Sequence, residues 1–204
     1  MRTAGVDTWT GLLRESLLRS AVRRVLAGAT ARPRWIPRRV LSVSADVDAA
    51  EGVGALRFVW RPRSRRGREH FELMRRYGRR WRSVGGGGGP AGDPVDVEVL
   101  DVRSGCGVRT FSHDHTPPIP NSFTLWIGCL EVHVGPDVDH VLVGTRRIPV
   151  PEGRALVAVW TSSHPGRPLR PVVVAVGRDG TELSRMGPLD GLDTHTRARL
   201  AREL

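Results

Sequence analysis

Two histidines separated by one residue, His113 and His115, are the pair in this sequence whose type and spacing point most directly to chemistry. In an extended strand both side chains point to the same face, as two ligands of one metal ion must. Imidazole is a common ligand of zinc, copper and iron. The segment GVRTFSHDHTPP is therefore a candidate metal site. The alternative is a solvent-facing His-Asp-His sequence that enters a proline-rich loop.

The spacing G-x5-H-x-H from Gly107 to His115 resembles the first half of the cupin metal motif. The sequence PEG at residues 151–153 resembles part of the second half of that motif. The resemblance implies a metal-dependent enzyme that uses His113 and His115 as ligands.

The sequence also departs from the cupin pattern. Cupins usually place a glutamate four or five positions after the second histidine, where this chain has Ile119 and Pro120. Leu156 occupies the place of the later histidine. A third ligand would have to be His133 or His140, and only folding could bring either one to the pair. A metal-dependent cupin-like enzyme is therefore the third of our three functional hypotheses.

Other catalytic chemistries lack their residues. All 32 basic side chains other than histidine are arginine, so no lysine is available for a Schiff base or for pyridoxal phosphate. The five glycines at 85–89 lack the Lys-Ser/Thr of a phosphate-binding loop. No G-x-S-x-G nucleophile elbow occurs. We predict no cofactor, and the sequence favours a protein that is not an enzyme.

The two cysteines, Cys106 and Cys129, are expected to be free, buried thiols. Asp7 stands where a signal peptide carries positive charge, and Arg14 and Glu15 interrupt the apolar stretch that follows. We therefore expect no export signal and a cytoplasmic protein. A disulfide is the alternative if the protein is exported.

Two pairs of carboxylates alternate near the ends of predicted strands: Asp46 with Asp48, and Asp137 with Asp139. Each pair could bind a cation, but aspartate beside Gly and Pro is ordinary turn chemistry, so we expect polar turns. Three tryptophans within apolar strands, Trp60, Trp126 and Trp160, are expected in the core.

An arginine-rich stretch occupies residues 61–82. Its candidate residues for binding an anionic partner are Arg61, Arg63, Arg65, Arg66, Arg68, Arg75, Arg76, Arg79, Arg80 and Arg82. Arginine grips phosphate or carboxylate with a planar fork, and interleaved aromatics offer stacking surfaces for bases. The alternation of Leu56 and Phe58 with Arg57 favours a simpler interpretation, in which the aromatics lie in the core and the arginines in solvent. Nucleic acid, an acidic protein and a lipid surface stay open as partners.

The basic charge is distributed unevenly. The net charge is +11, yet residues 1–90 hold 20 Arg against 7 Asp and Glu, while residues 91–204 hold 12 against 14. A high-GC bacterial genome, which the many Arg, Gly, Val and Pro codons indicate, would enrich arginine in both parts alike. The asymmetry therefore indicates either an anionic partner or internal neutralisation by the more acidic part.

The periodicity of the chain predicts a mainly β protein. Residues 10–27 have apolar positions at helical spacing, indicating a basic amphipathic helix that docks on the body or, less favoured, on an anionic membrane surface. From residue 40 the period is two, and about eight Val-rich strands alternate with turns. Residues 95–99 are expected to form a strand with one wet face, and residues 177–183 a tight turn. A terminal helix at 191–204 would be capped by Asp193 or Thr194.

We predict an antiparallel β-sandwich at 39–187, with an immunoglobulin-like form as one option. The N-terminal helix and a Pro/Arg linker precede it at 1–38, a short helix follows at 188–204, and a flexible Gly-rich loop lies at 85–94. No apolar run reaches the roughly 18 residues of a membrane span. The leading functional hypothesis is an interaction or regulatory module with an arginine-rich surface and a protein partner. The second is a nucleic-acid-binding protein that uses residues 61–82.

Overall fold

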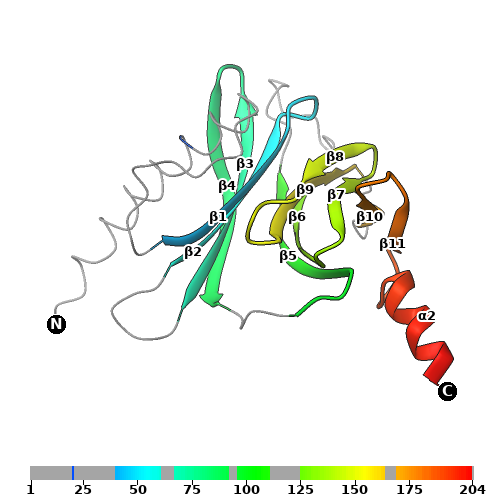
Figure 1. The fold of residues 1–204 in the computed structure, drawn as a ribbon. Helices are drawn as coiled ribbons and strands as arrows, with labels where there is room; N and C mark the ends of the chain where they lie inside the picture. Colours follow the sequence, from blue (N-terminus) through cyan, green and yellow to red (C-terminus); the bar gives the residue numbers. More distant parts are fainter. Residues whose placement is uncertain are drawn as a thin grey trace.

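The computed structural model describes Ser20 and residues 40–60, 67–91, 96–110, 125–163 and 169–203. These residues form eleven strands, with every strand pair antiparallel, and one helix close to the C-terminus (Figure 1). The prediction of a mainly β protein with antiparallel sheets and a short C-terminal helix is confirmed. The predicted N-terminal helix at 10–27 lies outside the described residues, apart from Ser20.

The strands form three sheets. The first sheet has the order β1-β2-β3-β4, with β1 at Val40–Asp48, β2 at Val53–Trp60, β3 at Arg68–Tyr77 and β4 at Arg80–Pro90. The middle sheet has the order β5-β6-β9, with β5 at Leu100–Thr110, β6 at Leu125–Val134 and β9 at Ala155–Ser162. The third sheet has the order β11-β10-β7-β8, with β7 at Val138–Val143, β8 at Arg146–Pro149, β10 at Val173–Gly177 and β11 at Glu182–Met186.

The middle sheet is buried on both faces, with the first sheet on one side and the third on the other (Figure 1). Leu130 and Val132 of β6 face the third sheet, whereas Ile127 and Cys129 face the first. Strands covered on both faces need no polar alternation, and this explains the nearly continuous apolar sequences of β6 and β9. Trp160 is buried and Trp126 packs against the same core, as predicted.

The glycine run is a strand and not the predicted loop. Gly85 to Gly89 lie within β4 and pair with β3 from Leu73 to Glu69. A Cβ at Gly86 would stand 2.5 Å from the carbonyl oxygen of Phe71 and 2.8 Å from Glu72 Oε2. The missing side chain therefore allows close approach between strands, a role that composition alone does not distinguish from flexibility.

The strand predicted at 95–99 begins later, at Leu100. Residues 97 and 99 are still partly buried and Asp96 and Glu98 exposed, so the predicted alternation of burial holds without strand pairing. Gly135 lies against this segment: its amide donates to Val99 O at 2.9 Å.

Polar side chains of β1 satisfy the free edge of β9. The amide of Val157 donates to Ser44 Oγ and that of Val159 to Asp46 Oδ2, both at 2.8 Å. Arg146 binds the same carboxylate at 2.9 Å and reaches Asp48 at 3.2 Å. Asp46 and Asp48 are therefore strand residues that bind an arginine. Asp48 ends β1 and also accepts the amide of Glu51 at 3.1 Å in the turn that follows, so the predicted turn role holds for Asp48, whereas Asp46 lies within the strand.

Both predicted features of the C-terminal part are present. The amide of Gly177 donates to Thr181 O at 2.8 Å, and Gly180 has a φ of 83°, so residues 177–181 form the tight turn between β10 and β11. Helix α2 spans Thr194–Glu203. Asp193 caps it, because its Oδ1 accepts the amides of His195 and Thr196 at 3.1 and 3.2 Å.

Candidate functional site: the arginine-rich hairpin

The sequence between β3 and β4 forms a tight hairpin. Tyr77 pairs with Arg80, which leaves Gly78 and Arg79 as a two-residue turn. Gly78 has a φ of 56°, the left-handed conformation that glycine adopts without strain at the first central position of such turns. The chain therefore reverses within two residues, and arginines on both strands are brought to one end of the first sheet.

Five of the predicted arginines meet at this end: Arg75, Arg76, Arg79, Arg80 and Arg82. We call them the hairpin arginines. Arg75 has a structural contact, since its Nη1 donates to Thr110 Oγ1 of β5 at 3.0 Å. Arg75 and Arg82 also lie over the ring of Tyr77, at 5.6 and 5.9 Å from its centre. These cation–π contacts hold two guanidinium groups beside the turn.

Four hairpin arginines have no carboxylate partner in the described part of the chain: Arg76, Arg79, Arg80 and Arg82. All four are exposed. The described arginines elsewhere include seven in ion pairs: Arg57, Arg103, Arg146, Arg147, Arg185, Arg197 and Arg199. Among these seven only Arg57 belongs to residues 1–90, and its ion pair with Glu131 is the one described pair in which an arginine of that part meets a carboxylate of residues 91–204. The described ion pairs therefore do not neutralise the hairpin end.

The remaining predicted arginines are not at this end. Arg68 pairs with Pro90, at the opposite end of β3 and roughly 30 Å from the turn. Arg61, Arg63, Arg65 and Arg66 lie outside the described residues.

Arg57 corrects the prediction that the arginines of β2 face solvent. It is 8% exposed, and its Nη2 lies 2.9 Å from Glu69 and 2.6 Å from Glu131 of the middle sheet. His133 Nε2 lies 2.7 Å from the same Glu131 oxygen. The prediction failed because both faces of the first sheet are buried at this point: Leu56 on one and Arg57 on the other.

The electrostatics of this buried cluster are set by Glu131. Burial alone raises the pKa of a carboxyl group, but the hydrogen bond with His133 and the charge of Arg57 outweigh it, so the pKa of Glu131 is lowered. The carboxylate stays ionised beneath the first sheet. Arg57 therefore joins two sheets and is not available to a partner.

The predicted metal ligands His113 and His115 lie outside the described residues. Within the described ranges, no group of three or more His, Cys, Asp or Glu side chains could hold a metal ion. His133 contacts Glu131, and His140 Nδ1 lies 3.0 Å from Asp139.

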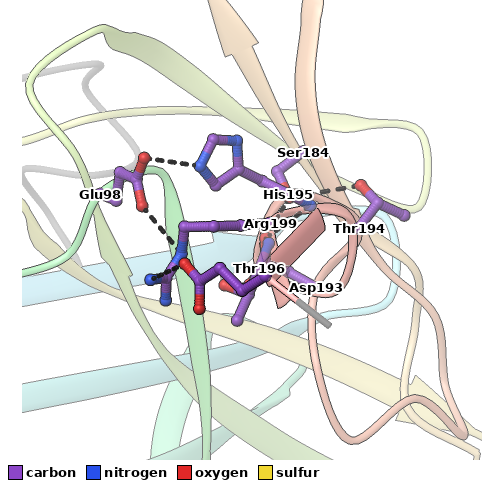
Figure 2. A network of polar contacts seen from close by, with 8 residues as sticks. Glu98, Ser184, Asp193, Thr194, His195, Thr196 and Arg199 are labelled. Atoms are coloured by element: carbon purple, nitrogen blue, oxygen red, sulfur yellow. Dashed lines mark hydrogen bonds and ion pairs between the residues drawn. The ribbon is translucent and has the colours of Figure 1, made fainter. Parts of the chain in front are cut away.

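A second polar network surrounds the start of α2, where Ser184, Asp193 and His195 are the residue types of a hydrolytic triad (Figure 2). Their geometry is that of a helix cap. The hydroxyl of Ser184 donates to Asp193, and the backbone amide of His195 donates to Ser184 Oγ at 3.1 Å. The imidazole points away from Ser184, and its Nε2 lies 2.9 Å from Glu98 Oε1 (Figure 2). The hydroxyl of Ser184 is thus directed at the carboxylate and not at an imidazole, which differs from the arrangement of a Ser-His-Asp triad.

The same network borders an open groove of about 370 Å³ between α2 and the start of β5. Leu192 and Met186 line it, together with Asp193 and Arg199. Asp193 caps the helix, and Arg199 Nε lies 3.5 Å from Glu98 Oε2 (Figure 2). These polar groups attach α2 to the body, and we assign the groove no ligand.

Comparison with protein-family models, with curated proteins and with solved structures finds no match to this chain. In the described ranges, no helix combines the length and the apolar character needed to cross a membrane.

Proposed function

We propose that this protein is a non-enzymatic interaction module whose arginine-rich hairpin binds an acidic protein surface. One observation carries the proposal: Arg76, Arg79, Arg80 and Arg82 are exposed around one turn and make no ion pair with a described carboxylate. Several like charges held together repel one another, and a partner rich in carboxylates relieves that repulsion. Arginine suits this role because its planar fork binds a carboxylate through two parallel hydrogen bonds.

The aromatic side chains favour an acidic protein over a nucleic-acid strand. Single strands bind where aromatic rings offer open faces on which bases stack. Guanidinium groups already lie over the ring of Tyr77, and Trp81 packs with Leu56 and Met74. Phe58 and Phe71 are likewise partly buried. The hairpin thus offers charge without stacking surfaces.

The scaffold supports the same role. The last seven strands, β5 to β11, form two sheets. The first, second and fifth of them (β5, β6 and β9) form one sheet, and the third, sixth and seventh (β7, β10 and β11) belong to the other. The two sheets pack face to face over one apolar core. This arrangement supports an immunoglobulin-like β-sandwich, extended by β8 beside β7 and by the first sheet that carries the hairpin. The hairpin itself lies on the first sheet, which the Arg57–Glu131 and Arg146–Asp46 ion pairs join to this sandwich.

The test is a titration of the full chain with fluorescently labelled polyglutamate at physiological salt, followed by anisotropy. The test variant is Arg76/Arg79/Arg80/Arg82→Ala, which spares Arg75 because of its contact with Thr110. Exposed ion pairs contribute up to about 1 kcal/mol each, so the loss of four lowers affinity on the order of tenfold or more.

A matched control removes the same charge elsewhere. Arg147/Arg185/Arg197/Arg199→Ala takes four exposed arginines that already have carboxylate partners. Its affinity should stay close to that of the unaltered chain. Equal losses in both variants, or no binding at physiological salt, would reject the hairpin as the site. The unaltered chain could instead bind a single-stranded oligonucleotide more tightly than polyglutamate, with this binding lost in the hairpin variant. That result would identify the partner as nucleic acid and not as an acidic protein.

A further inference from the structure

The two thiols lie together in the space between the first and middle sheets. Cys106 Sγ of β5 is 3.4 Å from Cys129 Sγ of β6, and both are free. Cys129 is buried, whereas Cys106 is only partly buried. A disulfide requires the sulfur atoms at about 2.05 Å, so closure needs an approach of roughly 1.4 Å, which side-chain rotation and small strand shifts supply.

A break in strand pairing creates this contact. The register of β5 and β6 shifts between Ser104 and Gly107, and two residues of β5 there oppose Cys129. A Cβ at Gly105 would stand 2.7 Å from Cys129 Sγ, so glycine at this position makes room for the sulfur. The backbone amide of Cys106 donates to Cys129 Sγ at 3.4 Å. The bulge thus holds the buried thiol against its neighbour.

We propose that Cys106 and Cys129 form an oxidant-responsive thiol pair, in which Cys106 reacts with a peroxide and Cys129 then closes an intramolecular disulfide. Thiols that respond to oxidants are accessible, ionise readily and have a resolving thiol close by. The partly buried Cys106 is the thiol that reacts with the oxidant, and the adjacent buried Cys129 is the resolving thiol.

Protonation supports this order. The hydrogen bond from Cys129 lowers the pKa of Cys106, against the opposing effects of burial and of Glu72. The same contact is the largest cause that raises the pKa of Cys129. Cys106 is therefore the first thiolate. Oxidation of Cys106 removes the thiolate that accepted a hydrogen bond from the Cys129 thiol, and with it the main effect that raised the pKa of Cys129.

The oxidation takes place in two steps. The Cys106 thiolate attacks one peroxide oxygen, the O–O bond breaks, and the products are a sulfenic acid at Cys106 and an alkoxide or hydroxide ion, which takes up a proton. The Cys129 sulfur then attacks the sulfenic sulfur and expels its oxygen, which leaves as water with the Cys129 proton. The two thiols are oxidised by two electrons in total, and the peroxide is reduced to one alcohol (or water) and one water.

The test treats the full chain with one equivalent of hydrogen peroxide and then alkylates the remaining thiols. We expect intact mass to show a chain two hydrogen atoms lighter that takes up no alkyl group, and peptide mapping to join Cys106 to Cys129. In Cys129→Ser the sulfenic acid should persist at Cys106 and react with dimedone. In Cys106→Ser the rate of thiol loss should fall at least tenfold.

The unaltered chain decides the matter even if a variant fails to fold. Both cysteines still alkylated after peroxide, or disulfides found only between two chains, would overturn the proposal. So would faster oxidation at Cys129 than at Cys106 in time-resolved peptide mapping. A circular-dichroism melt of each variant separates loss of reactivity from loss of structure.

Discussion

Single residues of this protein take their roles from contacts with distant segments. Arg57 is the clearest case, because the alternation of β2 places it opposite Leu56 and yet both are buried. Its guanidinium binds Glu69 of the neighbouring strand and Glu131 of another sheet. A buried ion pair adds little net stability over apolar packing, but removal of one partner leaves a buried charge uncompensated.

We therefore expect Arg57→Met to lower the free energy of unfolding by about 3–5 kcal/mol at neutral pH. Because the folded pKa of Glu131 is lowered, its ionised form contributes stability above the unfolded pKa of about 4.3 and loses it as the pH falls through the folded value. In Arg57→Met the part of this contribution that comes from Arg57 is absent, while the hydrogen bond with His133 remains. The difference in free energy of unfolding between Arg57→Met and the unaltered chain should therefore become smaller below about pH 4.

Urea denaturation across this pH range measures the effect. Arg185→Met is the control, because its pair with Glu182 is about half exposed and should change stability by no more than about 1 kcal/mol. Parallel pH curves for Arg57→Met and the unaltered chain would show that the Glu131 ion pair does not set the acid response.

At the scale of elements, β4 shows how composition can mislead. Five consecutive glycines predict a loop, because glycine disfavours strands through its conformational freedom. The pairing of this run with β3 compensates for that cost. The glycines are not equivalent, since a Cβ at Gly86 would meet Phe71 O at 2.5 Å while one at Gly87 would have no atom within 4 Å.

Two alanine substitutions test whether the glycines of β4 are needed for close approach to β3 or for backbone flexibility. Gly86→Ala should destabilise the protein by about 1–3 kcal/mol, because the neighbouring backbone must shift. Gly87→Ala should stay within about 0.5 kcal/mol. Thermal melts of the two variants compare them directly. Equal effects would mean that the run is selected for freedom of the backbone and not for approach to β3.

At the scale of the whole molecule, Arg146 links the three sheets. It lies on β8 of the third sheet, binds Asp46 and Asp48 of the first, and donates to Val159 O of the middle sheet. Asp46 is 7% exposed and also accepts the amide of Val159. Loss of the arginine therefore leaves a buried carboxylate without its ion-pair partner. No local pattern marks Arg146 apart from its neighbour Arg147.

Arg146→Ala should therefore lower the free energy of unfolding by about 3–5 kcal/mol. Arg147→Ala is the matched control, because the ion pair of Arg147 is with the exposed Asp139, and its free energy of unfolding should change by no more than about 1 kcal/mol. Guanidinium denaturation of both variants gives the comparison. A small loss for Arg146→Ala would show that apolar packing alone holds the three sheets together.

The sequence by itself determined the features that depend on neighbours along the chain. The period of two predicted most strands, and Asp179-Gly180 predicted a turn. The cap of the terminal helix was predicted as Asp193 or Thr194, and Asp193 takes that role. The sequence also showed the arginine cluster. Only the two-residue turn at Gly78 and the partners of the other arginines distinguished the four exposed hairpin residues that have no described carboxylate partner.

Tertiary structure decided everything that depends on pairing between distant segments. It placed Arg57 against Glu131, Arg146 against Asp46, the Cys106 sulfur against that of Cys129, and the glycines of β4 against β3. The physical reason is that a side chain's periodicity fixes the face on which it lies, whereas the register between sheets fixes what it meets there. Register is set by the packing of the whole molecule, and no local stretch of sequence contains it.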